Sequence, residues 1–501
     1  MGPNAPLPLD PMAFNWLWGY FMPIGLLLLI WGGLSPEKAR RVTPIAATAV
    51  ALTVLGYWAI GFALHMGGAY PVTQDPALEG LNRMFPIVPG DPGWGISGLS
   101  GFFLSGQTAN SRVFDLFLAY LPLMASAVLL VTLALAQTRR WIMVTAGLLA
   151  ATVVVPVAAC WMWGSGWLAH LGETLGLGHG FVDFGGSTLI LWLPGMMVVP
   201  ILLLQHREPP STPPEPPETY APLMANVGAL LLGIGWLGWE LSGPFHASGA
   251  VLDWQHIAIN VLLGMAGATV TSQLYAWLML GKPEALLASQ GLTAGWGAVL
   301  ASAAFVPYWA ALSIGLLAGL LLPLVHYGVR VWLRIQDAAG AVALAFVSGP
   351  LGLLSIGILA NGQWGQGWNR MGLSPDGSVS GPGVSGLFVS GGAQQLVAQV
   401  TALVSIGAWG LLWGGILGLI ASPRLLGRWS PRRALRGKTE EPTLVAVEEG
   451  AQAPETSATE AVAASTKVEL PPTDTELDSS KDADWSRDDL NDEGSPTEDE
   501  A

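Results

Sequence analysis

Three acidic residues, Asp115, Glu240 and Asp253, lie within or beside long apolar segments, toward the same ends of those segments. A carboxylate at the centre of a membrane helix costs roughly 3 kcal/mol, so an acid that is kept there is a candidate functional group. The chemistry that such a group offers is attraction of cations. The alternative is a hydrated acid at the membrane interface, and for Glu240 the sequence favours neither interpretation.

Other reactive side chains are sparse. Cys160 is the one cysteine and lies in an apolar segment, so an intrachain disulfide and a multi-thiolate metal site are excluded. The sequence contains no phosphate-binding loop, no zinc-ligand spacing and no nucleophile elbow. We therefore expect a protein that is not an enzyme and that uses neither a metal nor a cofactor.

The composition predicts an integral membrane protein. Hydrophobic residues make up 51% of the 501 residues and charged residues only 11%, against about 25% charged in soluble domains. Eleven apolar segments are each long enough to span a bilayer as a helix. They lie near residues 14–34, 43–65, 113–136, 141–163, 184–205, 221–242, 254–280, 288–306, 312–333, 339–360 and 393–421.

The basic residues predict the orientation, because cytoplasmic loops of membrane proteins are enriched in Lys and Arg. Most of them follow odd-numbered segments, as in Lys38–Arg41, Arg139–Arg140 and the run from Arg424 to Lys438. Only Arg83, Arg112 and Arg370 lie on the other side. We expect a multi-pass protein of the plasma membrane with its N-terminus outside and its C-terminus in the cytoplasm.

The first ten segments divide into two groups of five, and an odd number inverts the second group relative to the first. Asp183 opens the fifth segment at the predicted outer face, and Asp337 opens the tenth at the inner face. The predicted fold is therefore an all-α membrane domain, an inverted 5+5 repeat followed by one C-terminal helix. A site is expected where the two halves meet.

The charge distribution separates this domain from a tail. Residues 439–501 hold 19 acidic and 3 basic residues, and they are rich in Pro, Ser, Thr and Ala, a composition typical of disorder. We predict an external N-terminus over 1–13, a membrane domain over 14–421 with halves at about 14–205 and 221–360 and a last helix at about 393–421, a basic segment over 422–438, and a disordered acidic cytoplasmic tail over 439–501.

Several short motifs resemble the ammonium channel family (Amt/MEP/Rh). They are Trp163-Gly-Ser-Gly-Trp167 with Asp183-Phe-Gly-Gly-Ser-Thr188, Ile234-Gly-Trp-Leu-Gly-Trp239, Gly281-Lys-Pro283, Asp337-Ala-Ala-Gly340 and Gly391-Gly-Ala-Gln-Gln395. Each motif is weak alone, but their order along eleven segments is similar to that family. The resemblance implies a homotrimer with one pore through each subunit.

The resemblance also implies an outer site that recruits a cation. Trp163 matches the aromatic residue whose face attracts ammonium, by about 1–2 kcal/mol; the alternative is that it is one of 23 Trp residues, many in an interfacial belt. Trp239 matches one gate residue and Leu123 lies near the other. Ser242 is the nearest candidate for the hydroxyl of the site.

Three carboxylates would support this site. Asp183 matches the family's pore-helix aspartate, which shapes the site from behind, and Asp337 is its counterpart in the second half. Glu240 stands beside Trp239, where it would concentrate cations. Asp183 and Asp337 are thus expected to shape the pore, and Glu240 to help recruit the substrate.

The centre of the pore departs from the family. Its members line the lumen with two histidines, and these positions hold Leu191 and Val342, or Ala345 when counted back from Gly357. The His residues are 65, 170, 179, 206, 246, 256 and 326. Of these His326 could face a lumen, although a packing role is favoured. A wholly apolar centre would oppose a bare ion and admit neutral ammonia.

Three functions remain open. The leading one is a channel or transporter for ammonium and ammonia that recruits the cation outside and uses an apolar pore. The second is a non-conducting ammonium sensor or membrane scaffold whose acidic tail binds a cytoplasmic partner. The third is a channel for another small neutral solute. The segment after Ser422 lacks the family's regulatory pattern, so control by a GlnK-type protein is doubtful, and no nucleic acid is expected as a partner.

Overall fold

The computed structural model describes residues 16–73, 75–88, 91, 94–205, 216–241, 252–337, 340–372, 378–390 and 392–422. The predictions for the N-terminus over 1–13, for most of the basic segment and for the acidic tail lie outside these residues. The chain divides into two units, 1–434 and 435–501, of which the second falls wholly outside the described residues.

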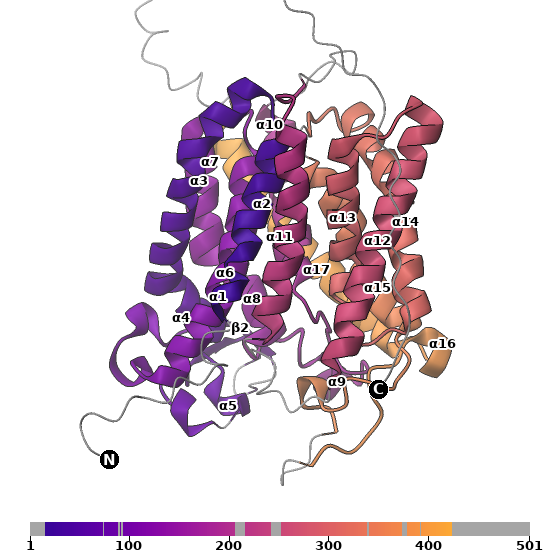
Figure 1. Cartoon of the computed structure of the whole chain (residues 1–501). Helices are drawn as coiled ribbons and strands as arrows, with labels where there is room; N and C mark the ends of the chain where they lie inside the picture. Colours follow the sequence, from indigo (N-terminus) through magenta and orange to yellow (C-terminus); the bar gives the residue numbers. More distant parts are fainter. Residues whose placement is uncertain are drawn as a thin grey trace, which may run out of the picture. The chain divides into compact units, whose positions relative to one another are not determined.

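The described part of the first unit is a bundle of long helices (Figure 1). The first half contains α1 (Trp16–Gly19), α2 (Phe21–Gly32), α3 (Pro36–Gly56) running through the π-helical turn η2 (Tyr57–Gly61) into α4 (Phe62–Met66), α6 (Ser111–Ala134), α7 (Arg140–Leu149) running through η7 (Ala150–Val154) into α8 (Val155–Trp163), and η8 (Thr188–Trp192) running into α10 (Leu193–Gln205). The second half contains α11 (Ala221–Leu241), α12 (Trp254–Leu280), α13 (Ala285–Leu300), α14 (Tyr308–Val331) and α15 (Ala341–Leu359), followed by α17 (Gln394–Ile420).

Short elements cover one end of the bundle, where α5, β2, α9 and α16 lie in Figure 1. They are α5 (Tyr70–Thr73), η3 (Pro76–Leu78), β1 (Met84–Pro86), β2 (Gly95–Gly98), η5 (Phe102–Leu104), η6 (Gly106–Thr108), α9 (Leu171–Leu175), η10 (Trp368–Arg370) and α16 (Leu387–Ser390). Strands β1 and β2 pair antiparallel, with Met84 opposite Gly98. We call this the outer end, following the charge-based prediction, and the opposite end the inner end.

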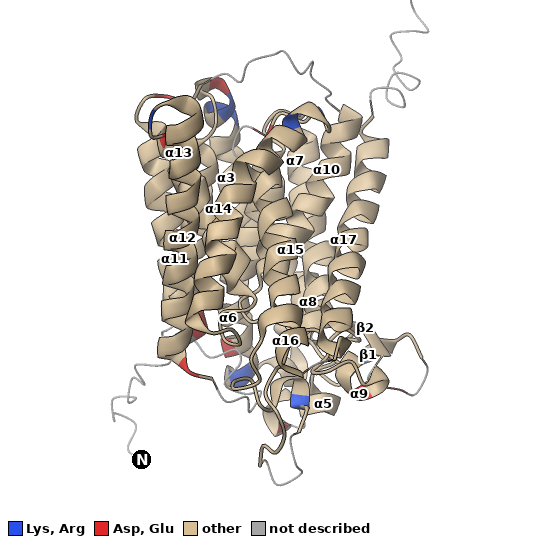
Figure 2. Cartoon of the chain, turned by 90° about the vertical axis from the view of Figure 1, so that its right-hand side faces the viewer, with Lys and Arg blue, Asp and Glu red and all other residues tan. Residues whose placement is uncertain are grey.

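Charged residues lie toward the two ends of the bundle, and the helices between the ends carry few of them (Figure 2). Nine helical segments of the described chain are long and apolar enough to span a membrane. Two further predicted segments coincide with the shorter apolar helices Trp16–Gly32 and Ala285–Leu300. The mostly helical membrane fold is thus confirmed, while the count of eleven spans stays a prediction.

Two predicted boundaries differ from the structure for local reasons. The fifth segment becomes helical only at Thr188, because Gly186 has a φ of 74° and breaks the helix before it. The eighth segment, expected to reach residue 306, leaves the helix after Leu300 and ends in a turn before Pro307, which precedes the first residue of α14.

Helix contacts in one half have counterparts in the other. In the first half α6 contacts α2, α3 and α7; in the second half α13 contacts the corresponding helices α11, α12 and α14. The first helices of the two halves, α2 and α11, cross each other, with the backbones of Gly25 and Gly228 in direct contact. This repeated pairing is what an inverted repeat requires.

The last helices of the two halves, α10 and α15, also cross at small residues. A Cβ on Gly195 would lie 2.2 Å from the Cβ of Ala345, and a Cβ on Gly349 would lie 2.8 Å from the Cβ of Trp192. Gly195 follows Asp183 by the same number of residues as Gly349 follows Asp337. The two glycines therefore let the halves approach closely at equivalent positions.

The crossing predicts an unequal response to two identical substitutions. Gly195→Ala should destabilise the protein by about 1–3 kcal/mol, because the new methyl group overlaps Ala345. Gly415→Ala in α17 is the matched control, since a Cβ there meets no atom within 4 Å and should stabilise the helix by up to about 1 kcal/mol. Thermal unfolding of the purified protein measures both, and equal melting temperatures would contradict the close crossing.

Candidate functional site

A carboxylate shapes the turn between α9 and η8. Asp183 is 1% exposed and accepts hydrogen bonds at 2.9 Å from the backbone N–H groups of Gly186 and Thr188. Burial raises the pKa of the Asp183 carboxyl, while the hydrogen bonds from Thr188 and Gly186 oppose that rise. The carboxylate thereby satisfies donors that a helix start leaves unpaired.

Gly186 brings this turn against two neighbouring helices. With its φ of 74°, a Cβ at Gly186 would lie 2.7 Å from Cη2 of Trp163 and 3.0 Å from Cδ1 of Leu123. Only glycine fits this backbone conformation and this space without strain. The structure therefore places the predicted residues Trp163 and Leu123 beside the Asp183 turn.

An aromatic cluster stands at the same place, formed by Tyr120 of α6, Trp163 of α8 and Trp239 of α11. The ring centroids of Tyr120 and Trp163 are 5.7 Å apart in a stacked arrangement, those of Trp163 and Trp239 are 5.9 Å apart, and those of Tyr120 and Trp239 are 6.2 Å apart. Trp239 is buried and donates its indole N–H to the Ala119 carbonyl at 2.6 Å. Trp163 is only half-buried.

Tyr120 is the member of this cluster that the sequence analysis missed. Leu123 was predicted to lie near the second aromatic gate position, and Tyr120 lies three residues earlier on the same helix. Residues three apart share a helix face, so the spacing could have indicated Tyr120 as the aromatic partner of Trp163. Both residues face the site, Leu123 at Gly186 and Tyr120 at the indole rings.

Glu240 lies next to the cluster, near the end of α11. It is 1% exposed, and within the described residues neither carboxylate oxygen has a hydrogen-bond partner. Its carboxyl lies close enough to Asp183 and to Tyr120 for their ionisation to be linked. Glu240 is therefore a buried acid rather than a hydrated interfacial one.

The other acids singled out from the sequence lie elsewhere. Asp115 is exposed on α6, and Asp253 caps α12 by accepting the N–H groups of Gln255 and His256 at 3.1 Å. Ser242 lies outside the described residues. The structure thus brings together Trp163, Trp239, Leu123, Asp183 and Glu240, and leaves Asp115 and Asp253 out of the cluster.

The positions that lack histidine are packed with apolar side chains. Leu191, Val342 and Ala345 are each at most 1% exposed. A Cβ on Gly297 would lie 2.4 Å from Cδ1 of Leu191 and 2.7 Å from the hydroxyl oxygen of Ser348. Leu191 therefore fills the notch that Gly297 leaves in α13, and the hydroxyl of Ser348 is the polar group beside it.

A family model described as Ammonium Transporter Family matches residues 12–428. The chain belongs to this family. Amt2 of Archaeoglobus fulgidus, described as an ammonium transporter, is 27% identical over 451 residues that cover 87% of each chain. Amt1 of Haloferax mediterranei, also described as an ammonium transporter, is 27% identical over 392 residues that cover 71% of this chain and 70% of that one.

Solved structures agree in fold with this family member. Saccharomyces cerevisiae Mep2 aligns with a TM-score of 0.63 at 20% identity, covering 85% of this chain and 91% of Mep2. A structure named sensor Amt protein also aligns with a TM-score of 0.63, at 19% identity, covering 82% of this chain and 91% of the other. At these identities the likeness shows a shared fold and leaves function to other evidence.

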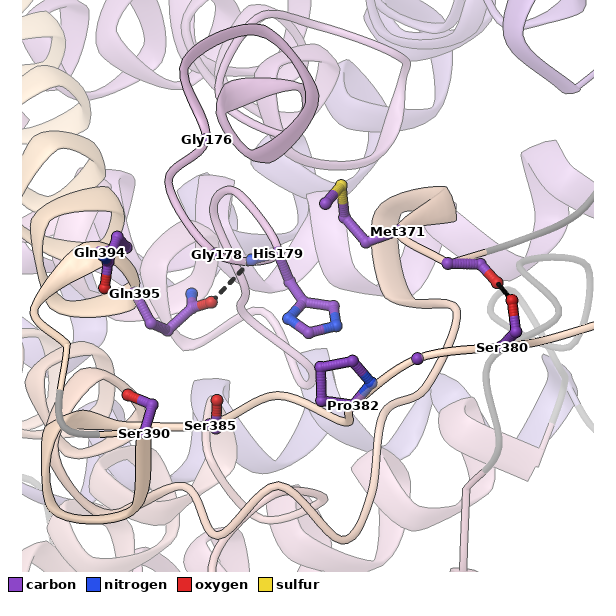
Figure 3. Close-up of a pocket in the computed structure, with 12 residues that line it drawn as sticks. Gly176, Gly178, His179, Met371, Ser380, Pro382, Ser385, Ser390, Gln394 and Gln395 are labelled. Atoms are coloured by element: carbon purple, nitrogen blue, oxygen red, sulfur yellow. Dashed lines mark hydrogen bonds between the residues drawn. The ribbon is translucent and has the colours of Figure 1, made fainter.

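At the outer end of the bundle, a cavity of about 340 Å³ lies beside the segment that precedes Asp183 (Figure 3). Its wall contains His179, whose ring lies beside Pro382 and whose backbone N–H donates to Oε1 of Gln395 at 2.9 Å. Gln395 also donates to the Gly180 carbonyl, and Gln399 donates to that of Val182. The start of α17 thus fixes residues 179–182 immediately before the turn.

His179 predicts a pH dependence of stability. Burial lowers the pKa of His179, while a hydrogen bond to the Pro382 carbonyl opposes that effect. Because the folded state then binds this proton less tightly than the unfolded state, stability should fall as the pH drops below the ordinary His pKa of about 6.5. His179→Gln should lose less melting temperature than the wild type between pH 7.5 and pH 5. An equal loss in both would show that His179 charges freely in the folded protein.

Proposed function

We propose that this protein is a channel or transporter for ammonium and ammonia that recruits the ammonium ion at the cluster of Tyr120, Trp163 and Trp239. The observation that carries the proposal is the half-buried Trp163, whose ring stacks on Tyr120 beside the Asp183 turn. The family to which the chain belongs and the description of Amt2 as an ammonium transporter support this substrate.

Recruitment would use the electrostatics of the aromatic rings and of one acid. An indole face attracts a partly desolvated cation by about 1–2 kcal/mol. The buried Glu240 carboxyl lies next to Trp239, and in its ionised form it would attract a cation with little screening by solvent. Asp183 would act from behind, because both of its oxygens hold the backbone of the turn. In this proposal Ser242 keeps the role of the site's hydroxyl that the resemblance gives it.

Neutral ammonia, rather than the ammonium ion, would pass through the centre of the bundle. Leu191, Val342 and Ala345 present no charge and no strong hydrogen-bonding group, and moving an ion into such surroundings is very costly. Ammonium would therefore release a proton at the outer end, and ammonia would cross the apolar centre beside Leu191. Because Leu191 fills the notch at Gly297, passage along this route would require its side chain to move.

The resemblance carries the finer parts of the proposal. The protein would act as a homotrimer in the plasma membrane, with its N-terminus outside and its C-terminus in the cytoplasm. The acidic residues 439–501 would there be available to a cytoplasmic partner. A catalytic activity is not part of the proposal, because neither the motifs nor the relatives point to one.

Replacing Trp163 tests the recruitment site. Trp163→Leu should reduce the initial rate of ¹⁵N-ammonium entry into proteoliposomes about 5- to 30-fold at low ammonium. Removing the ring removes about 1–2 kcal/mol of binding free energy. Trp309→Leu is the control, since Trp309 lies on α14 with 62% of its surface exposed and represents an interfacial tryptophan.

Equal rates in the wild type and in Trp163→Leu would contradict the assigned site, as would equal losses in the two tryptophan variants. A wild-type protein that remains folded but admits no more ammonium than empty liposomes would contradict the transport function itself.

A further inference from the structure

The turn at Asp183 has a counterpart at the inner end of the bundle. Asp337 accepts hydrogen bonds from the backbone N–H groups of Val342 at 3.2 Å and Ala343 at 2.8 Å. Gly340 follows Asp337 by three residues with a φ of 73°, as Gly186 follows Asp183 with a φ of 74°. Each half thus begins its last helix with a carboxylate and a left-handed glycine.

The neighbours of the two glycines correspond as well. Gly186 packs between Leu123 of α6 and Trp163 of α8. A Cβ at Gly340 would lie 2.5 Å from Nε2 of Gln290 on α13 and 2.9 Å from Cε1 of His326 on α14. Helix α13 is the counterpart of α6, and α14 is the counterpart of the α7–α8 helix, so the same elements converge on both turns.

The side chains at the inner turn carry different chemistry. His326 Nε2 lies 3.0 Å from Oε1 of Gln290. The amide oxygen can only accept, so Nε2 carries the hydrogen and the neutral ring presents Nδ1 as an acceptor. His326 and Asp337 are both half-buried.

We propose that His326 and Gln290, held at the Gly340 turn beside Asp337, form a second ammonium site at the inner end of the bundle. Ammonium would donate a hydrogen bond to Nδ1 of His326, and the Asp337 carboxylate would supply the attracting charge. This inference rests on the proposed function, because it completes the path of the same substrate. The aromatic recruitment site outside and the hydrogen-bonding site inside would be related by the inverted repeat.

A purely structural role for His326 is the competing explanation, because its hydrogen bond to Gln290 also connects α14 to α13. The two explanations differ in sidedness. Loss of a hydrogen bond between helices would lower the stability of the protein and affect transport from both sides equally. Loss of a binding site would raise the ammonium concentration needed at one side only.

The experiment compares right-side-out and inside-out membrane vesicles that contain the full-length protein, with ¹⁵N-ammonium added to the outside of each. His326→Phe should raise the half-saturating ammonium concentration at the inner face at least fivefold and leave that at the outer face within twofold. Gln290→Leu should act in the same direction. Trp163→Leu should show the opposite sidedness, and Tyr327→Phe, the exposed neighbour on α14, should match the wild type.

Equal changes at both faces, or unchanged half-saturation in His326→Phe, would overturn the inner site. Should the wild type carry no flux, the proposed function fails, and ammonium binding to the purified protein then tests the inner site separately. By ¹⁵N NMR titration, binding that survives in Trp163→Leu and disappears in His326→Phe would support the site. Binding that is indifferent to His326→Phe would refute it.

Discussion

The rest of this structure depends on one interaction that occurs in both halves. A carboxylate binds the backbone of the turn in which its helix begins. At Asp183 and at Asp337 the oxygens accept hydrogen bonds from N–H groups that would otherwise be unsatisfied in an apolar environment. The bond fixes a left-handed glycine three residues later. Because that glycine has no side chain, two neighbouring helices can place side chains directly against it.

The two ends differ in the side chains that the neighbouring helices place against the glycine turns. Outside they bring aromatic and aliphatic groups, Trp163 and Leu123, and the adjoining Tyr120 and Trp239 extend the aromatic surface. Inside they bring hydrogen-bonding groups, His326 and Gln290. Between the ends the halves cross on glycine and alanine, with Leu191 filling the centre. A backbone frame that repeats with inversion therefore carries two different surfaces and an uncharged middle.

The helices and the two related halves were easier to predict from the sequence than the candidate site. The long apolar segments predicted the helical bundle, and the equivalent positions of Asp183 and Asp337 predicted its two related halves. Both features depend only on local composition and spacing. The helix start at Thr188 escaped prediction, because the composition of Ser187–Thr188 does not reveal the left-handed Gly186 before it.

The site was harder to predict because its contacts join distant segments. Trp163, Trp239 and Glu240 were identified from motifs, whereas Tyr120 becomes a partner of Trp163 only once α6 packs against α8. The burial of Glu240 depends on tertiary packing and could not be read from its place at a segment end. For the same reason the sequence did not reveal that His326 lies beside Gln290 and Gly340, because the three residues come from separate segments.

The central claim is that the apolar centre passes a neutral molecule and excludes the ion. The most direct measurement is an ammonium pulse on proteoliposomes of the purified protein, with transmembrane current and internal pH recorded together. The account predicts a rise in internal pH faster than in empty liposomes and no current, because only ammonia passes Leu191. A transient current that disappears in Trp163→Leu would contradict it and would require a path for charge through the middle of the bundle.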